Sequence, residues 1–134
     1  MMAALCMAMP VGRTHTIECP ATIRVQQSLV PAAPEPWVAY DTKEGPDYIF
    51  YGVSFSDGPP KKRVFLVPSK TIRSGNVTEE IYDFKAANVS NVWLLCLYRD
   101  TSTAISRRID GVGRCRVTYD PKTGFRSVKA VDCD

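Results

Sequence analysis

Four widely separated cysteines constrain the fold of this chain more than any other feature. Cys19, Cys96, Cys115 and Cys133 all follow a short apolar N-terminus, and no two of them have the close spacing of a CxxC redox or zinc motif. Wide spacing is typical of disulfides in a domain that folds in an oxidising compartment. We therefore expect two disulfides. Four thiolates on one zinc ion are the alternative, which the lack of close pairs disfavours.

The N-terminus resembles part of a secretory signal. Residues 1–9 read MMAALCMAM, and the first charge, Arg13, comes only after a proline and a glycine. A short apolar run of this kind is typical of the central region of a signal peptide, here without its basic start. The alternative is a buried N-terminal helix, for which nine residues are short.

Cleavage of this segment defines the predicted domain. We assign residues 1–16 to a truncated signal peptide, cut after Ala8 or just before Ile17, and residues 17–134 to a single secreted β-rich domain. Cleavage removes Cys6 and leaves an even set of cysteines. The predicted location is the periplasm or the outside of the cell.

Length and charge limit the classes of partner. The 134 residues fit one domain with a hydrophobic core. The formal net charge of +3 is too balanced to predict a nucleic acid or a membrane surface as partner. No segment is apolar over the roughly 20 residues that a membrane-spanning helix needs, so membrane insertion is not expected. Another protein is the partner class that is left, and no oligomeric state is predicted.

Proline and glycine punctuation predicts a mainly β fold. Ten prolines and eight glycines leave intervals that are long enough for strands and seldom for helices. We expect an antiparallel sheet, a small sandwich or a barrel-like meander, stapled by disulfides, with at most one short helix. Strands are predicted over 17–25, 47–55, 63–67, 91–99, 104–109, 115–120 and 125–133, and a single helical turn over 78–84.

Some of these strands have predicted neighbours. The runs 47–55 and 63–67 are expected to form a hairpin across the stiff loop SDGPPKK. The segment 91–99 is the most hydrophobic of the mature chain and is predicted to be the central strand, with 104–109 returning alongside it.

The last hairpin leads to a prediction of the disulfide pairing. If the four residues PKTG form its loop, Cys115 lies opposite Ala130, and Cys133 points to the other face of the sheet. A bond between Cys115 and Cys133 is then disfavoured. Of the two pairings that remain, we prefer Cys96–Cys115 with Cys19–Cys133. The first ties the central strand to the hairpin, and the second ties the two ends of the domain together.

The sequence lacks the residues that most catalytic sites require. The only histidine, His15, falls at or before the expected cleavage point, and the P-loop, GxSxG, HExxH and dinucleotide motifs are absent. We predict no catalytic residue, no metal and no cofactor. Several carboxylates could act on a glycoside, although turn formation explains the first three more simply: Asp41, Glu44, Asp47, Glu79 and Glu80.

A proline-rich loop with a charged tip is the candidate partner-binding site. Two adjacent prolines stiffen it, and three basic side chains follow them. Its residues are Asp57, Gly58, Pro59, Pro60, Lys61, Lys62 and Arg63. The simpler explanation, solvated charge on an ordinary loop, stays open.

Several short motifs, in the same order along the mature chain, resemble a known family. They are Cys19-Pro20, FSDGPP at 55–60, Trp-x-x-Cys-x-Tyr at 93–98, Cys115 and the terminal Cys133. The chain thus resembles a family of small exported proteins of Gram-negative bacteria that has no established activity. The resemblance implies periplasmic export and paired cysteines.

Three function classes are compatible with these observations. The first is a non-enzymatic periplasmic binding protein of the inhibitor or immunity type, which occupies a partner's cleft with the loop 57–63. The second is a cell-wall or glycan hydrolase that uses Asp and Glu carboxylates. The third is a structural or stress protein of the cell envelope.

Overall fold

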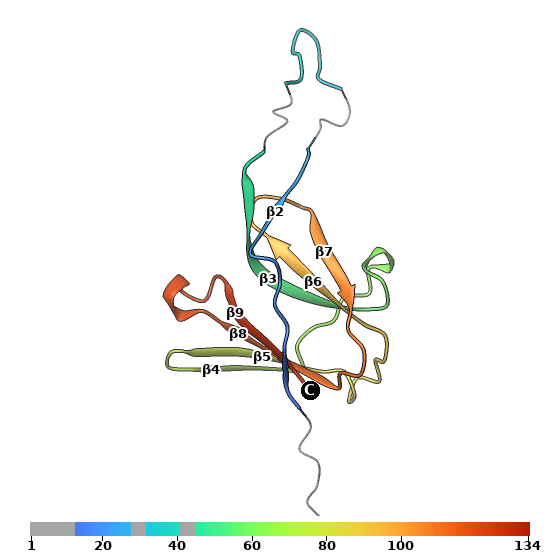
Figure 1. Ribbon diagram of the computed structural model, residues 1–134, viewed down its shortest axis with the longest axis vertical. Coiled ribbons are helices and arrows are strands. Elements are labelled where there is room, and N and C mark those ends of the chain that lie inside the picture. Colours follow the sequence, from blue (N-terminus) through green and yellow to red (C-terminus); the bar gives the residue numbers. More distant parts are fainter. Residues whose placement is uncertain (1–12, 28–31, 41–44) are drawn as a thin grey trace, which may run out of the picture.

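The structure is a computed structural model that describes residues 13–27, 32–40 and 45–134. This part of the chain folds into nine β-strands and two short 3-10 turns, without an α-helix (Figure 1). The strands form two antiparallel sheets, which confirms the predicted mainly β fold. None of these residues belongs to a helix that is long and apolar enough to cross a membrane.

The sheets have five and four strands. The five-stranded sheet contains, side by side, β1 (His15–Thr16), β9 (Val128–Cys133), β8 (Arg114–Tyr119), β5 (Val77–Asp83) and β4 (Lys70–Ser74). The four-stranded sheet contains β2 (Thr22–Arg24), β3 (Asp47–Asp57), β6 (Val92–Tyr98) and β7 (Ala104–Arg108). The turns are η1 (Pro60–Lys62) and η2 (Pro121–Thr123). Because β6 lies between β3 and β7, the predicted central strand and its returning neighbour are confirmed.

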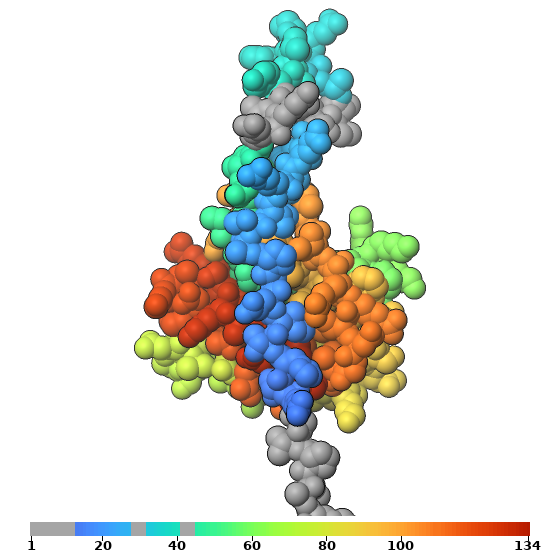
Figure 2. Space-filling view, viewed as in Figure 1, coloured from blue at the N-terminus to red at the C-terminus, as the bar shows by residue number. Residues whose placement is uncertain are grey.

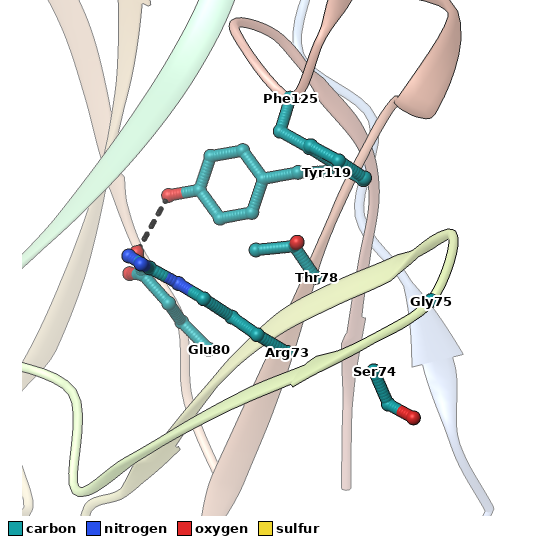
Figure 3. Close-up of a pocket in the computed structure, with 7 residues that line it drawn as sticks. All are labelled: Arg73, Ser74, Gly75, Thr78, Glu80, Tyr119 and Phe125. Carbon is teal, nitrogen blue, oxygen red and sulfur yellow. Dashed lines mark hydrogen bonds between the residues drawn. The ribbon is translucent and has the colours of Figure 1, made fainter.

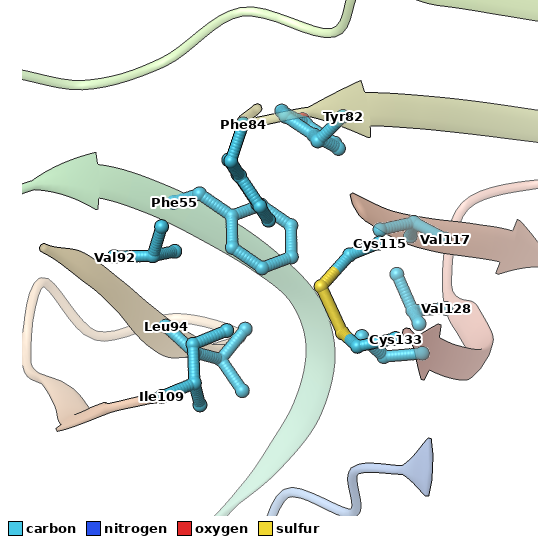
Figure 4. Packing of buried hydrophobic residues seen from close by; sticks show 11 residues of the cluster. Phe55, Tyr82, Phe84, Val92, Leu94, Ile109, Cys115, Val117, Val128 and Cys133 are labelled. Carbon is cyan, nitrogen blue, oxygen red and sulfur yellow. A yellow bond between two sulfur atoms is a disulfide. The ribbon is translucent and has the colours of Figure 1, made fainter. Parts of the chain in front are cut away.

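The two sheets pack face to face around Phe55. This side chain of β3 is fully buried, and its ring centroid lies 4.6 Å from that of Tyr82 and 5.2 Å from that of Phe84, both on the other layer (Figure 4). Burial of one such ring contributes about 1.5–3 kcal/mol, so these contacts join the layers strongly. The other buried side chains of the cluster are Val92, Leu94, Ile109, Cys115, Val117, Val128, Val131 and Cys133.

The N-terminal segment crosses from one sheet to the other. β1 pairs with β9 of the five-stranded sheet, and β2 pairs with β3 of the four-stranded sheet. Between them, Cys19 is bonded to Cys96 of β6, and the Tyr98 hydroxyl donates a 2.8 Å hydrogen bond to the Pro20 carbonyl. Figure 2 shows this segment as a band over the front of the body. Of the predicted strand 17–25, only Thr22–Arg24 is a strand, and the preceding part that contains Cys19 ties the two layers together.

Residues 32–40 project from the body beyond β2 and the start of β3 (Figure 1). A turn forms where the Trp37 amide donates a 2.8 Å hydrogen bond to the Pro34 carbonyl. The apolar side chains Trp37, Val38 and Tyr40 are exposed there.

The predicted helical turn over 78–84 is wrong, because this segment is strand β5. β5 pairs with β4 on one side and with β8 on the other. Alternate side chains, among them Glu80 and Tyr82, consequently point to the same face of the sheet. The spacing of Ile81 and Phe84 matched one helical face, but pairing with two neighbouring strands overrides this local preference.

The predicted hairpin between 47–55 and 63–67 is reduced to a small contact. β3 pairs along most of its length with β6. From the second segment only Phe65 forms a bridge, to Ser56, and Leu66 donates a 2.9 Å backbone hydrogen bond to the Phe55 carbonyl. The most hydrophobic strand thus occupies the place beside β3 that the sequence analysis gave to 63–67.

The predicted disulfide pairing is also wrong. Cys19 is bonded to Cys96, and Cys115 is bonded to Cys133, the pairing that the sequence analysis disfavoured. In the actual register of β8 and β9, Cys115 lies directly opposite Cys133, with 4.1 Å between their Cα atoms. Cross-strand neighbours this close can be bridged without moving the backbone.

The length of the last hairpin loop and a β-bulge next to it explain the error. The loop runs from Asp120 to Ser127, whose backbone carbonyl accepts a 2.8 Å hydrogen bond from the Asp120 amide. Inside it, the Asp120 carboxylate accepts a hydrogen bond from the Lys122 amide, and Gly124 and Phe125 both have positive φ. The turn therefore takes in more residues than PKTG, but pairing of Asp120 with Ser127 alone would place Cys115 opposite Asp132. A β-bulge supplies the remaining shift: Tyr119 lies opposite Val128 and Thr118 lies opposite Ala130, and this extra residue in β9 brings Cys133 opposite Cys115.

Mapping of the disulfides tests this connectivity directly. A tryptic digest of the unreduced protein is expected to join peptide 14–24 to peptide 86–99, and peptide 115–116 to peptide 130–134. Mass spectrometry that found 86–99 joined to 115–116 would contradict it.

Because the Cys19–Cys96 bond spans 77 residues, the variant Cys19→Ala/Cys96→Ala is expected to lose about 4–5 kcal/mol of unfolding free energy in urea titrations.

Candidate functional site

The loop 57–63, predicted from the sequence to bind a partner, is held in one conformation by its own hydrogen bonds. The buried Ser56 hydroxyl donates a 2.8 Å hydrogen bond to the Gly58 carbonyl, and the Gly58 amide donates a 2.7 Å bond to the Asn91 carbonyl. At the far end, the Arg63 amide donates to the Pro60 carbonyl and closes the 3-10 turn. Gly58 has a φ of 80°, which a residue with a Cβ adopts only with strain.

This backbone exposes a compact group of basic and apolar side chains. Lys61, Lys62 and Arg63 are exposed, and none of them forms an ion pair with another described residue. Val64 and Phe65 follow directly, and 51% of the Phe65 surface is exposed. We call these five residues the loop surface. Arginine and aromatic side chains beside each other on a fixed backbone are typical of protein-binding surfaces.

A second candidate site is a hollow of about 470 Å³ on the five-stranded sheet. Figure 3 shows that side chains from the hairpin of β4 and β5, from β8 and from the last hairpin loop surround it. None of its lining residues belongs to the four-stranded sheet. They are Arg73, Ser74, Gly75, Thr78, Glu80, Tyr119 and Phe125.

Strand pairing places this hollow on the face of the sheet that carries the core. Glu80 lies opposite Val117, a buried residue of the core cluster, so the two side chains share one face. Thr78 is two residues from Glu80 along β5 and lies on the same face. The hollow therefore lies on the same side of the sheet as the core, at a point where this side is open to solvent.

Two tyrosines fix the carboxylate of Glu80. The Tyr119 hydroxyl donates a 3.0 Å hydrogen bond to Glu80 Oε1, and the Tyr82 hydroxyl donates a 3.0 Å bond to Oε2. Burial raises the pKa of Tyr119 to about 12, and the charge of Glu80 and its hydrogen bond add to the effect. The pKa of Tyr82 is raised by the same causes, burial first. Both hydroxyls thus stay protonated donors at neutral pH.

Within the described part of the chain, the carboxylates that the sequence offered for glycoside hydrolysis are not gathered in one site. Asp41 and Glu44 lie outside the described residues. Asp47 is exposed and pairs with Arg24 at 2.9 Å. Glu79 and Glu80 are neighbours on a strand and point to opposite faces, so they cannot flank a single bond.

The hollow was missed as a unit by the sequence analysis. Glu80 was considered only as one of several carboxylates, and its tyrosine partners were not considered at all. The alternation of Thr78, Glu80 and Tyr82 is the signal that could have grouped them, had the segment been interpreted as a strand. Tyr119 comes from a distant strand, and only the pairing of β5 with β8 brings it close.

Fold and surfaces together define a disulfide-held antiparallel sandwich with a fixed basic loop. Residues 43–134, from just before β3 to the end of the chain, match the family described as the Type VI secretion system Tli immunity protein family. The chain belongs to this family. It is thus an immunity-type protein that binds another protein, as the first of the three function classes predicted.

Comparison with other proteins adds one relative and no solved structure. The chain is 30% identical over 113 residues to an uncharacterized 16.3 kDa protein in the trpG 5' region of Azospirillum brasilense, an alignment that covers 79% of this chain and 73% of the relative. No solved structure matches the chain significantly. The family match confirms that the chain belongs to a family of small proteins, whereas the quoted motifs and the export stay predictions.

Substitution of Glu80 is expected to change the titration of Tyr119. In Glu80→Gln the negative charge is gone, so the pKa of Tyr119 falls from about 12 toward its ordinary value of 10.0, while burial keeps it above that value. Tyrosinate absorbance during an alkaline titration measures the change, and Tyr119→Phe identifies the transition. An unchanged Tyr119 transition in Glu80→Gln would contradict the contact.

Stability is expected to fall at alkaline pH for the same reason. The pKa of Tyr119 is higher in the folded protein, about 12, than the ordinary value of 10.0 expected on unfolding. The contribution of Tyr119 to the unfolding free energy is therefore complete below pH 10 and is lost as the pH rises to 12 and beyond. Urea unfolding at a series of pH values measures this loss, which should be smaller in Tyr119→Phe.

Proposed function

We propose that this immunity protein protects its cell by binding its cognate Type VI effector through the loop surface, without catalysing a reaction itself. The family match supports binding of a toxic partner. The observation that carries the assignment to this surface is the loop itself, in which three unpaired basic side chains and two apolar ones stand on a hydrogen-bonded backbone.

A fixed loop favours tight binding because little conformational entropy remains to be lost. Ordering one flexible side chain on binding costs roughly 0.5–1.5 kcal/mol, and ordering of a loop backbone adds to this cost. The Ser56 and Gly58 hydrogen bonds already hold the loop backbone in the free protein, so less ordering is left for the binding step. The basic side chains would meet an acidic region of the effector and accelerate association. Phe65 would supply the apolar anchor at the centre of the contact.

The compartment that fits this proposal is the periplasm. The disulfides Cys19–Cys96 and Cys115–Cys133 suit an oxidising space, and the apolar start of the chain resembles a signal peptide. Because His15 and Thr16 pair with β9, cleavage just before Ile17 would remove β1 from the five-stranded sheet. We therefore favour cleavage after Ala8.

Reversal of charge on the loop surface is the first test. Lys61→Glu/Lys62→Glu/Arg63→Glu is expected to slow association with the cognate effector at least tenfold in surface plasmon resonance and to abolish protection of cells that express the effector.

The apolar part of the loop surface is tested by Phe65→Ala. This variant should weaken the complex by about 2 kcal/mol, chiefly through faster dissociation.

The matched control is Lys85→Glu/Arg107→Glu/Lys129→Glu. It makes the same change in charge with the same residue types at exposed positions outside the loop surface and outside the hollow. Full binding by the control together with association slowed at least tenfold in the first variant supports the proposal. Equal binding by both variants would assign the effector to another surface.

Export is tested on the protein made from its own genome. We expect the mature protein in the osmotic-shock fraction, with an intact mass that begins at Met9 and lacks four hydrogens for its two disulfides. A cytoplasmic product that keeps residues 1–8, and with them Cys6, and that has five free thiols would contradict the location.

A further inference from the structure

The hollow on the five-stranded sheet contains a negative charge that has no cationic partner. Both oxygens of the Glu80 carboxylate accept hydrogen bonds, but the donors are the neutral hydroxyls of Tyr82 and Tyr119. Within the described ranges of the chain, no lysine or arginine lies within ion-pair distance of Glu80. The side chain is also partly buried. A partly buried charge that is only hydrogen-bonded gains free energy when a cation approaches it.

Arg73 lines the same hollow without forming an ion pair with Glu80. It lies opposite Thr78 in the pairing of β4 with β5, and Figure 3 shows its guanidinium end over the Glu80 carboxylate in that view. The arginine is exposed. The hollow therefore combines a carboxylate that lacks a direct ion pair with one exposed basic group.

Aromatic rings form the remaining wall. Tyr119 and Phe125 come from β8 and the last hairpin loop. Figure 3 shows the Tyr119 ring reaching toward Glu80 and the Phe125 ring above Tyr119, farther from Glu80. Aromatic faces attract cations, and a planar guanidinium both stacks on a ring and donates paired hydrogen bonds to a carboxylate. An anion would be repelled by Glu80, and a purely apolar group would take water from the carboxylate without replacing it.

The size of the hollow fits a side chain presented by another molecule. Its volume of about 470 Å³ lies within the roughly 300–1,000 Å³ that is usual for ligand sites. The hydroxyls of Ser74 and Thr78 add hydrogen-bonding groups among its lining residues. An arginine side chain with part of its backbone can occupy such a space.

We propose that this hollow is a binding site for a guanidinium group, with Glu80 as its charge partner and Tyr119 and Phe125 as its aromatic wall, and that the group is an arginine side chain of the protein partner. The source of the arginine rests on the proposed function, whereas the chemistry of the site does not. The β4–β5 hairpin and the last hairpin loop, which line the hollow, lie on the opposite side of the body from the loop 57–63 (Figure 1), so each site can be altered without the other.

The site is tested first without any partner. N-acetyl-arginine methylamide is titrated into the isotopically labelled full chain, with both disulfides intact, and amide shifts are followed by NMR. We expect saturable shifts at residues 73–80, 119 and 125, and none with N-acetyl-citrulline methylamide, a neutral molecule of nearly the same shape. Equal shifts with both molecules, or shifts confined to other residues, would overturn the proposal.

Two variants identify the groups responsible. Glu80→Gln keeps the shape of the side chain and removes its charge, and it should weaken binding of the arginine probe roughly tenfold or more. Phe125→Ala removes part of the aromatic wall at the tip of a hairpin and should weaken binding roughly three- to tenfold. Near-ultraviolet circular dichroism shows whether each variant is folded. A folded variant of either kind with unchanged probe affinity would contradict the site.

The source of the arginine is tested with the cognate effector. Glu80→Gln should weaken the complex with the effector roughly tenfold, additively with the charge-reversed loop surface. If probe binding is lost in Glu80→Gln but the effector binds as before, the assignment to a partner arginine is wrong and a free guanidinium compound is the ligand. If the loop variant binds the effector normally while the probe results hold, the proposed function fails and the site stands.

Discussion

The contact of Phe55 with Tyr82 and Phe84 is the interaction on which the rest of the molecule depends. It joins the two sheets, and both candidate surfaces begin within a few residues of it. On one layer, β3 continues from Phe55 through the buried Ser56, whose hydroxyl holds the loop surface in place. On the other layer, Tyr82 reaches from the core with its hydroxyl on Glu80. Loss of this packing would therefore loosen both surfaces at once.

The disulfides reinforce this packing in two different ways. Cys115–Cys133 joins adjacent strands and is itself part of the buried cluster that Phe55 contacts. Cys19–Cys96 ties the segment between β1 and β2 to the central strand of the other sheet, and thereby closes the sandwich along one side. Cys19 precedes the part of the chain that matches the immunity family, whereas Cys96 lies within it, so the family match covers only one end of this second disulfide.

The two candidate surfaces differ in charge, in position and in how far the sequence predicted them. The loop 57–63 could be predicted because its proline pair and adjacent basic residues are contiguous in the chain. The hollow could not, because Glu80 and Tyr119 come from strands that are distant in sequence and meet only through the register of β5 and β8. The segment 78–84 has a local pattern that fits a helix, and only its pairing with β4 and β8 makes it a strand.

The sequence by itself determined that the chain is mainly β, that its most hydrophobic segment is the central strand, and that four cysteines form two bonds. These follow from composition and periodicity, which act locally along the chain. Only the tertiary structure decided which cysteines are paired and which side chains share a face. The physical reason is the register of the last hairpin. The loop from Asp120 to Ser127 is longer than a four-residue turn, and a β-bulge between Thr118 and Tyr119 shifts the strands by one residue more. Together they bring Cys133 opposite Cys115 and leave Cys96 for Cys19.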